Sequence, residues 1–215
     1  MKPLYRVLII VIIVVFSSSF NASTSIDCTS QSNNTLQQQK ELEKIAAAAI
    51  SIINPNIQYD PSYFAIKYPN GDIPVNKGVC TDVIIRAYRK LNIDLQKEVH
   101  DDMRAHFNLY PNIKKWGLHT TDTNIDHRRV PNLEVFFSRQ GQKPPVTSKA
   151  DDYKSGEIVT WMINDKFPHI GIITNQKSSD SNTPLIVHNI GAGQVLEDCL
   201  FKYKIVGHFK YFKKS

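Results

Sequence analysis

The chain has 215 residues, 41% of them hydrophobic, which is enough for one domain with a sizeable core. Its 26 lysines and arginines exceed its 20 aspartates and glutamates, and the formal charge of +6 suits anionic partners such as nucleic acid, acidic lipid or bacterial wall polymer. The charges are dispersed, however, without a basic helix, an RNA-binding motif or a zinc finger, which argues against a nucleic-acid partner.

The N-terminus has the pattern of an export signal. Lys2 and Arg6 precede an unbroken apolar run from Val7 to Phe16, and Ser17, Ser18 and Ser19 follow. Positive charge, a short apolar run and small residues are the three parts of a secretory signal peptide. We therefore predict a signal peptide over residues 1–22, with an uncleaved membrane anchor as the alternative. The protein is then exported to the periplasm or cell envelope, or secreted, and its N-terminal segment engages the membrane during export.

A single domain is expected over residues 35–215, after a polar, flexible lead-in at residues 23–34. Thr35 can cap a helix whose apolar residues keep helical spacing up to Ile53, and Asn54 and Pro55 stop it. The following stretch, Tyr59–Val75, is rich in proline and turn residues and predicts a loop.

Cys80 stands at a predicted helix start. Apolar residues recur after it at the spacing of a helix with one buried face, namely Val83, Ile84, Ala87, Tyr88 and Leu91. The free N–H groups of a first turn favour thiolate over thiol, which suits a nucleophilic cysteine. The carboxylate of Asp82 would oppose thiolate formation if it points inward. The alternative is a buried, inert cysteine.

Three cysteines in an exported chain leave one unpaired if a disulfide forms. Pairing of Cys28 with Cys199 would leave Cys80 free; alternatively, none of them pairs. The sequence leaves this open.

The rest of the chain predicts short helices and then strands. A helix is expected over Gln96–Phe107 and a helix or strand over Leu133–Arg139. Four β-branched and aromatic runs then predict strands, at Glu157–Ile163, His169–Thr174, Leu185–Ile190 and Ile205–Phe212. Helices followed by consecutive strands indicate an α+β fold with an antiparallel sheet.

Two histidines fall on the same predicted hairpin. If Ile172 faces Leu185 across the ladder, His169 lies opposite His188 on one face of the sheet. The Cys80 helix can pack against this sheet, and the three side chains then have defined roles. Cys80 attacks a carbonyl carbon, His169 holds the thiolate as an ion pair and protonates the leaving amine, and His188 orients His169. A zinc site made by the same three residues ranks lower because no fourth ligand stands at a recognisable spacing. We expect no metal and no cofactor.

Several ordered segments resemble a known bacterial family, the domain of unknown function 1287, over roughly Ile45–Phe212. They are Gly78–Asp82, Asp94–Gln96, Asp101–Met103, Ile125–Leu133, His169–Ile172 and His188–Gly191. A more distant similarity, to the NlpC-type papain-like cell-wall cysteine peptidases, is carried by Tyr68, Cys80, Ser155–Val159, His169–Ile172 and His188.

The peptidase similarity implies a papain-like fold and hydrolysis of amides in peptidoglycan stem peptides through a Cys-His-His triad. It implies that Tyr68 supports the carbonyl oxygen beside the Cys80 backbone N–H. Thr81 stands where those peptidases have serine, so substrate contacts beside the nucleophile differ. Arg128 or Arg129, in an insertion without a counterpart, clamps a stem-peptide carboxylate or forms ion pairs with nearby aspartates, namely Asp101, Asp102 or Asp126.

The function predicted from the sequence is therefore an exported cysteine peptidase or amidase acting on peptidoglycan. Two alternatives remain. The first is a non-catalytic wall-binding module that retains the fold, and the second is an acyltransferase on the same scaffold, because an acceptor other than water can resolve a thioester. The sequence indicates no oligomeric state.

Overall fold

The computed structural model describes the backbone of residues 24–213 and the side chains from residue 33 to residue 213. The predicted signal peptide or anchor, residues 1–22, lies outside the described residues. The chain divides into two compact units, Met1–Thr35 and Leu36–Ser215. None of the helices in the described part of the chain is long and apolar enough to cross a membrane.

The first helix, α1 (Thr24–Ser51), begins earlier than the sequence indicated. The backbone is helical from Thr24, where a flexible lead-in was expected and Thr35 was expected to be the cap. Polar side chains one turn apart support the helix, as in the 3.0 Å hydrogen bonds from Gln37 to Glu41 and from Gln39 to Glu43. A polar composition therefore did not prevent helix formation here.

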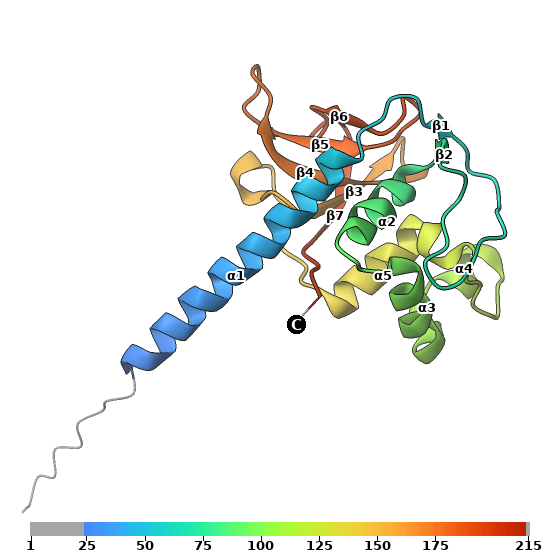
Figure 1. Ribbon diagram of the computed structural model, residues 1–215, viewed down its shortest axis with the longest axis horizontal. Helices are drawn as coiled ribbons and strands as arrows, with labels where there is room; N and C mark the ends of the chain where they lie inside the picture. Colours follow the sequence, from blue (N-terminus) through green and yellow to red (C-terminus); the bar gives the residue numbers. More distant parts are fainter. Residues whose placement is uncertain (1–23, 214–215) are drawn as a thin grey trace, which may run out of the picture. The chain divides into compact units, whose positions relative to one another are not determined.

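The compact unit Leu36–Ser215 combines helices with an antiparallel sheet, which confirms the α+β class (Figure 1). Two short strands, β1 (Gln58–Tyr59) and β2 (Lys77–Gly78), pair in parallel before α2 (Cys80–Lys90). The other helices are α3 (Leu95–Ala105), α4 (Asn112–Trp116) and α5 (Val130–Gln140), with 3-10 turns η1 (Phe107–Leu109), η2 (Asp126–Arg128) and η3 (Ala150–Asp152).

The sheet has the strand order β6-β5-β4-β3-β7 in the described residues. Its strands are β3 (Ile158–Ile163), β4 (Phe167–Lys177), β5 (Pro184–His188), β6 (Val195–Glu197) and β7 (Lys204–Phe209). All four expected strands are present with shifted ends. The sequence missed α4, which has five residues, and β6, which has three, because such short elements carry no periodic pattern.

Each face of the sheet packs against its own core. Ile170, Ile172 and Val187 belong to the cluster that also contains Cys80 and the buried residues of α2. Val159, Trp161 and Ile186 belong to a second cluster with Cys199 and Leu200. Because side chains alternate along a strand, His169 and His188 lie on the face of this second cluster.

The register of the β4–β5 hairpin differs from the expected one. Ile172 pairs with Val187 rather than with Leu185, and Ile173 pairs with Ile186. This shift of two residues keeps every side chain on its predicted face, since the strand period is two. His169 and His188 therefore share a face as predicted, but they meet diagonally instead of directly opposite each other. The expectation that the Cys80 helix packs against this face was wrong, because α2 packs against the other face, where Ile170 and Ile172 lie. The expected symmetric hairpin was wrong because the register shifts between Ile173 and Lys177. Over this stretch β4 has more residues than the facing part of β5, so the two strands are not matched residue for residue.

Candidate functional site

Cys80 is the first residue of α2, as the sequence predicted. The backbone is extended at Val79, and the Asp82 carboxylate accepts a 2.7 Å hydrogen bond from the Val79 N–H, which caps the helix. Asn189, which follows β5, donates a 3.2 Å hydrogen bond to the Gly78 carbonyl. The helix start is thus fixed from its own first turn and from the sheet.

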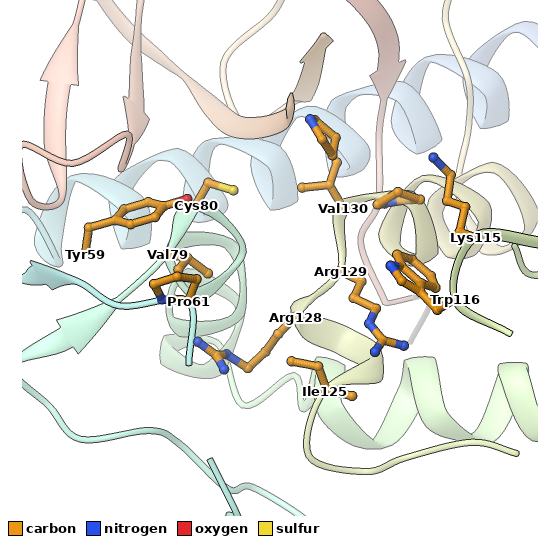
Figure 2. Close-up of a pocket in the computed structure, with 12 residues that line it drawn as sticks. Tyr59, Pro61, Val79, Cys80, Lys115, Trp116, Ile125, Arg128, Arg129 and Val130 are labelled. Atoms are coloured by element: carbon orange, nitrogen blue, oxygen red, sulfur yellow. The ribbon is translucent and has the colours of Figure 1, made fainter. Parts of the chain in front are cut away.

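Cys80 lines a pocket of about 400 Å³. Figure 2 shows Cys80 and Tyr59 on one side of the pocket and Lys115 and Trp116 on the other. The remaining lining residues are Pro61, Val79, Ile125, Arg128, Arg129, Val130, Pro131 and Pro168. Cys80 itself is 5% exposed, so the pocket leads to a nearly buried thiol.

The Cys80 thiol is neutral in this structure. Burial, followed by the charge of Asp82, raises the pKa of the Cys80 thiol to about 12, although backbone groups at Ile170 and Thr81 favour the thiolate. Ile170 lies on β4 directly after His169. No side-chain hydrogen bond joins Cys80 to His169 among the described residues, so the ion pair expected from the sequence is not the resting state.

Arg128 is occupied by an ion pair with Asp82. Its Nε lies 3.0 Å from Asp82 Oδ1 and its Nη2 3.2 Å from Oδ2, and Nη1 donates to the Ser62 carbonyl at 3.1 Å. The Thr81 hydroxyl donates to the Arg128 carbonyl at 3.2 Å. Arg128 and Thr81, two of the three residues predicted for substrate binding or the oxyanion site, therefore hold α2 against the segment at η2. Of the two functions considered for Arg128, the structure shows the ion pair, but with Asp82 rather than with Asp101, Asp102 or Asp126.

Tyr68 is not brought to the pocket. It is 37% exposed, and its ring packs edge-on against His100 of α3 with the ring centroids 5.3 Å apart. Tyr59 of β1 lines the pocket instead, and burial together with the nearby Cys80 raises the pKa of the Tyr59 hydroxyl to about 12. Its hydroxyl is thus a hydrogen-bond donor at neutral pH.

His169 and His188 form a hydrogen-bonded chain that ends on a carboxylate. His169 Nε2 lies 2.8 Å from His188 Nδ1, and His188 Nε2 lies 2.8 Å from Glu197 Oε2. His169 also packs on Trp161, with the ring centroids 5.6 Å apart. Sequence reasoning missed Glu197 because β6 was not predicted. Glu197 and His188 share a face because His188 pairs with Val195, two residues before Glu197.

The carboxylate fixes the proton positions along this chain. A carboxylate only accepts, so His188 donates from Nε2 to Glu197 and its Nδ1 accepts from His169 Nε2. His169 Nδ1 is then left as an acceptor. Burial, with the neighbouring His188, lowers the pKa of His169 to about 3, so the ring is neutral at pH 7. The arrangement therefore holds a neutral imidazole with one nitrogen free to take a proton.

Comparison with known proteins decides the family. Residues 46–211 match the family described as "Domain of unknown function (DUF1287)". The chain belongs to this family. It is 48% identical over 170 residues to the uncharacterized protein YijF of Escherichia coli (strain K12), a match that covers 79% of this chain and 82% of that protein. No solved structure matches the chain. The residues of the pocket and of the His169–His188–Glu197 chain all lie within the family match.

Arg129 supplies a cation that no carboxylate of the described residues neutralises by direct contact. Its guanidinium lies over the Trp116 ring, 4.3 Å from the ring centroid, and its Nη1 atom is buried without a hydrogen-bond partner in the structure (Figure 2). Stacking on an indole orients a guanidinium while leaving its N–H groups free for a planar anion. Of the two arginines considered from the sequence, Arg129 is the one available to bind an anionic ligand.

His127, next to Arg128, makes the fold sensitive to acid. Burial, and then the charge of Arg128, lowers the pKa of His127 to about 3, and its Nδ1 atom has no hydrogen-bond partner in the structure. In the unfolded chain the pKa is about 6.5, so between pH 6.5 and 3 the unfolded state binds the extra proton. Stability is therefore present above pH 6.5 and is lost as the pH falls.

Urea unfolding between pH 7 and pH 4 tests this expectation. Between pH 6.5 and 4, His127 should account for a loss of about 3 kcal/mol in the free energy of unfolding. His127→Gln should flatten the pH dependence by about that amount, and the matched change of exposed His119 to glutamine should not. An equal slope for wild type and His127→Gln would contradict the assignment.

Proposed function

We propose that the protein is a papain-like cysteine hydrolase that cleaves amide bonds in bacterial cell-wall peptides. One observation carries the proposal. Cys80, at the start of a helix, lines a pocket and contacts the backbone of Ile170, and the residue directly before Ile170 begins the His169–His188–Glu197 chain. Nucleophile, base and orienting groups are the three parts of such a catalytic site. The order of these residues along the chain also resembles that of the NlpC-type peptidases.

The reaction begins with the Cys80 thiol protonated and the His169 ring neutral. In the resting structure the His169 ring lies on the sheet face of Trp161, away from α2, so substrate binding must bring His169 Nδ1 within reach of the Cys80 thiol. His169 Nδ1 then takes the proton of this thiol as the sulfur attacks the amide carbonyl, because catalytic hydrogen bonds tighten in the substrate complex. His169 then gives this proton to the amine as the C–N bond breaks, which leaves a thioester on Cys80. Water, deprotonated by His169, cleaves the thioester and restores the thiol. His188 and Glu197 hold the His169 ring in the required tautomer throughout.

Two donors suit the oxygen that becomes negative during the attack. The backbone N–H of Cys80 belongs to the first turn of α2, where the N–H groups have no partner within the helix and the helix dipole favours negative charge. Tyr59 takes the part that the sequence assigned to Tyr68, since Tyr59 lies beside Cys80 on the same side of the pocket (Figure 2). Tyr59 thus replaces Tyr68 as the side-chain donor of the oxyanion site.

Arg129, Trp116 and Lys115 support an anionic peptide as the substrate. Arg129 and Lys115 place two positive charges in the pocket, and Arg128 is already neutralised by Asp82. Peptidoglycan stem peptides carry free carboxylates beside their amide bonds. An Arg129–carboxylate contact would position such a stem for attack by Cys80. Export to the periplasm or cell envelope, where this substrate lies, remains part of the proposal.

Mass spectrometry of fragments released from purified peptidoglycan tests the proposal. We expect the protein to release soluble peptides with one new amino and one new carboxyl end, whose masses identify the amide. Peptidoglycan whose stem carboxylates have been converted to amides should be cut at least about tenfold more slowly, because Arg129 then lacks its anion. Binding to peptidoglycan without any release, while a known wall peptidase releases fragments from the same preparation, would favour a wall-binding module instead.

A further inference from the structure

Three residues whose side chains can bind a metal ion, His188, Glu197 and Cys199, lie close together beside His169. Glu197 ends β6, and Cys199 follows it in a turn, where it is a free, buried thiol. Of the Cys28–Cys199 disulfide left open by the sequence, the structure describes only Cys199, whose thiol is free; the side chain of Cys28 lies outside the described residues. Cys199 Sγ lies 3.6 Å from His188 Nε2, the atom that also contacts Glu197 Oε2 at 2.8 Å. One ligand atom from each residue lies within 4.8 Å of the other two.

We propose that His188, Glu197 and Cys199 bind Zn²⁺ or a divalent cation of similar softness. One imidazole, one carboxylate and one thiolate are ligands that zinc accepts, and three protein ligands leave a fourth position open to water. This is a different set from the Cys80, His169 and His188 site considered from the sequence. It shares only His188 and lies on the opposite face of the sheet from the helix of Cys80.

The distances fit a tetrahedral zinc ion. With Zn–N of about 2.0 Å and Zn–S of about 2.3 Å, tetrahedral angles separate the two ligand atoms by about 3.5 Å. Cys199 Sγ and His188 Nε2 lie 3.6 Å apart, close to this separation. The carboxylate oxygen must retreat from His188 by about half an ångström to make room for the ion. The Glu197 side chain is 40% exposed and can move in this way.

The neighbouring charges also permit a cation. Lys202 Nζ lies 3.4 Å from Glu197 Oε1, the carboxylate oxygen that does not contact His188, and the lysine side chain is more than half exposed. It can therefore turn into solvent. Asp198, between two of the ligands, accepts hydrogen bonds from Ser181 and Thr183 and so holds the turn in place. The exposed side of Glu197 gives an entry path for the ion.

Occupancy of this site would change the hydrogen bond to His169, a consequence that rests on the proposed hydrolase function. A metal on His188 Nε2 leaves the ring proton on Nδ1, which then donates to His169 Nε2. The proton of His169 must move to Nδ1, so this nitrogen can no longer accept the proton of the Cys80 thiol. Zinc at this site would therefore inhibit the hydrolase without contacting its pocket.

Metal binding is tested separately from hydrolysis. Zn²⁺ binding is measured by titration calorimetry, and Co²⁺ serves as the spectroscopic probe. Both experiments use the Cys80→Ala protein, because this change removes the other buried thiol of the described residues. We expect one ion per chain and a thiolate-to-cobalt charge-transfer band. Cys199→Ser should abolish the band and Glu197→Gln should weaken Zn²⁺ at least about tenfold. Lys204→Gln, a change at an exposed lysine of β7, is the matched control.

The outcomes separate the two proposals. Absence of Zn²⁺ binding, or a cobalt band that survives Cys199→Ser in a protein with unchanged circular dichroism, would overturn the metal site. Glu197→Gln guards against a folding defect, because its side chain is partly exposed and the change conserves its shape. Zinc that binds at this site without slowing fragment release would overturn the inhibition and leave the metal site standing. If the protein releases no fragments from peptidoglycan, the hydrolase proposal fails, but Zn²⁺ binding measured by calorimetry should be the same.

Discussion

Replacement of Cys80 by alanine is expected to lower the rate of fragment release from peptidoglycan by at least about a thousandfold, since no other group in the pocket can form the acyl intermediate. Lys115, Arg128 and Arg129 are cations, and burial raises the pKa of the Tyr59 hydroxyl to about 12, which keeps it protonated. The rate is measured by mass spectrometry of soluble peptides at several times of incubation.

The chain offers a matched control for this change. Cys28 belongs to the unit Met1–Thr35, whereas all the pocket residues belong to the unit Leu36–Ser215, so Cys28→Ala should release fragments at the wild-type rate. Thermal melting of Cys80→Ala checks the fold, because the change removes one buried sulfur atom. Equal release by wild type and a folded Cys80→Ala protein would rule out Cys80 as the nucleophile.

The features that the sequence predicted correctly are those set by residues close together in the chain. The start of α2 at Cys80 follows from the spacing of its apolar residues and from Asp82. Asp82 is the third residue of the helix, and its carboxylate accepts a hydrogen bond from the Val79 N–H. The shared face of His169 and His188 follows from the two-residue period of strands, and it survived an incorrect register. Each of these features depends on residues that are close in the sequence or on one hairpin.

Features that depend on distant contacts were not predictable. Tyr59 and Tyr68 both belong to the proline-rich stretch Tyr59–Val75, and no local signal says which one reaches the pocket. Glu197 joins His188 only because the short strand β6 returns to β5. The sequence placed three aspartates beside the arginines, yet the partner of Arg128 is Asp82, 46 residues away. Such pairings are decided by tertiary packing, which a single sequence does not display.

The pairing of Arg128 with Asp82 predicts the largest effect on stability. The side chains are 2% and 3% exposed, so Arg128→Met would leave the Asp82 carboxylate buried and without its cation. Removal of one partner of a buried ion pair costs about 3–5 kcal/mol, because the remaining charge loses its compensation. Guanidinium or urea unfolding should show a loss of this size in the free energy of unfolding.

Two further variants separate the buried charge from a general effect of losing an arginine. Arg104 makes a 4.0 Å surface contact with Asp101 and its side chain is 73% exposed, so Arg104→Met should cost at most about 1 kcal/mol. Arg128→Met combined with Asp82→Asn should recover part of the loss, since the amide carries no charge and its oxygen can still accept the Val79 N–H. A loss below about 1 kcal/mol for Arg128→Met would mean that water reaches Asp82. Because Asp82 also raises the pKa of the Cys80 thiol, the same ion pair that holds α2 against η2 limits how far Asp82 opposes the thiolate that catalysis requires.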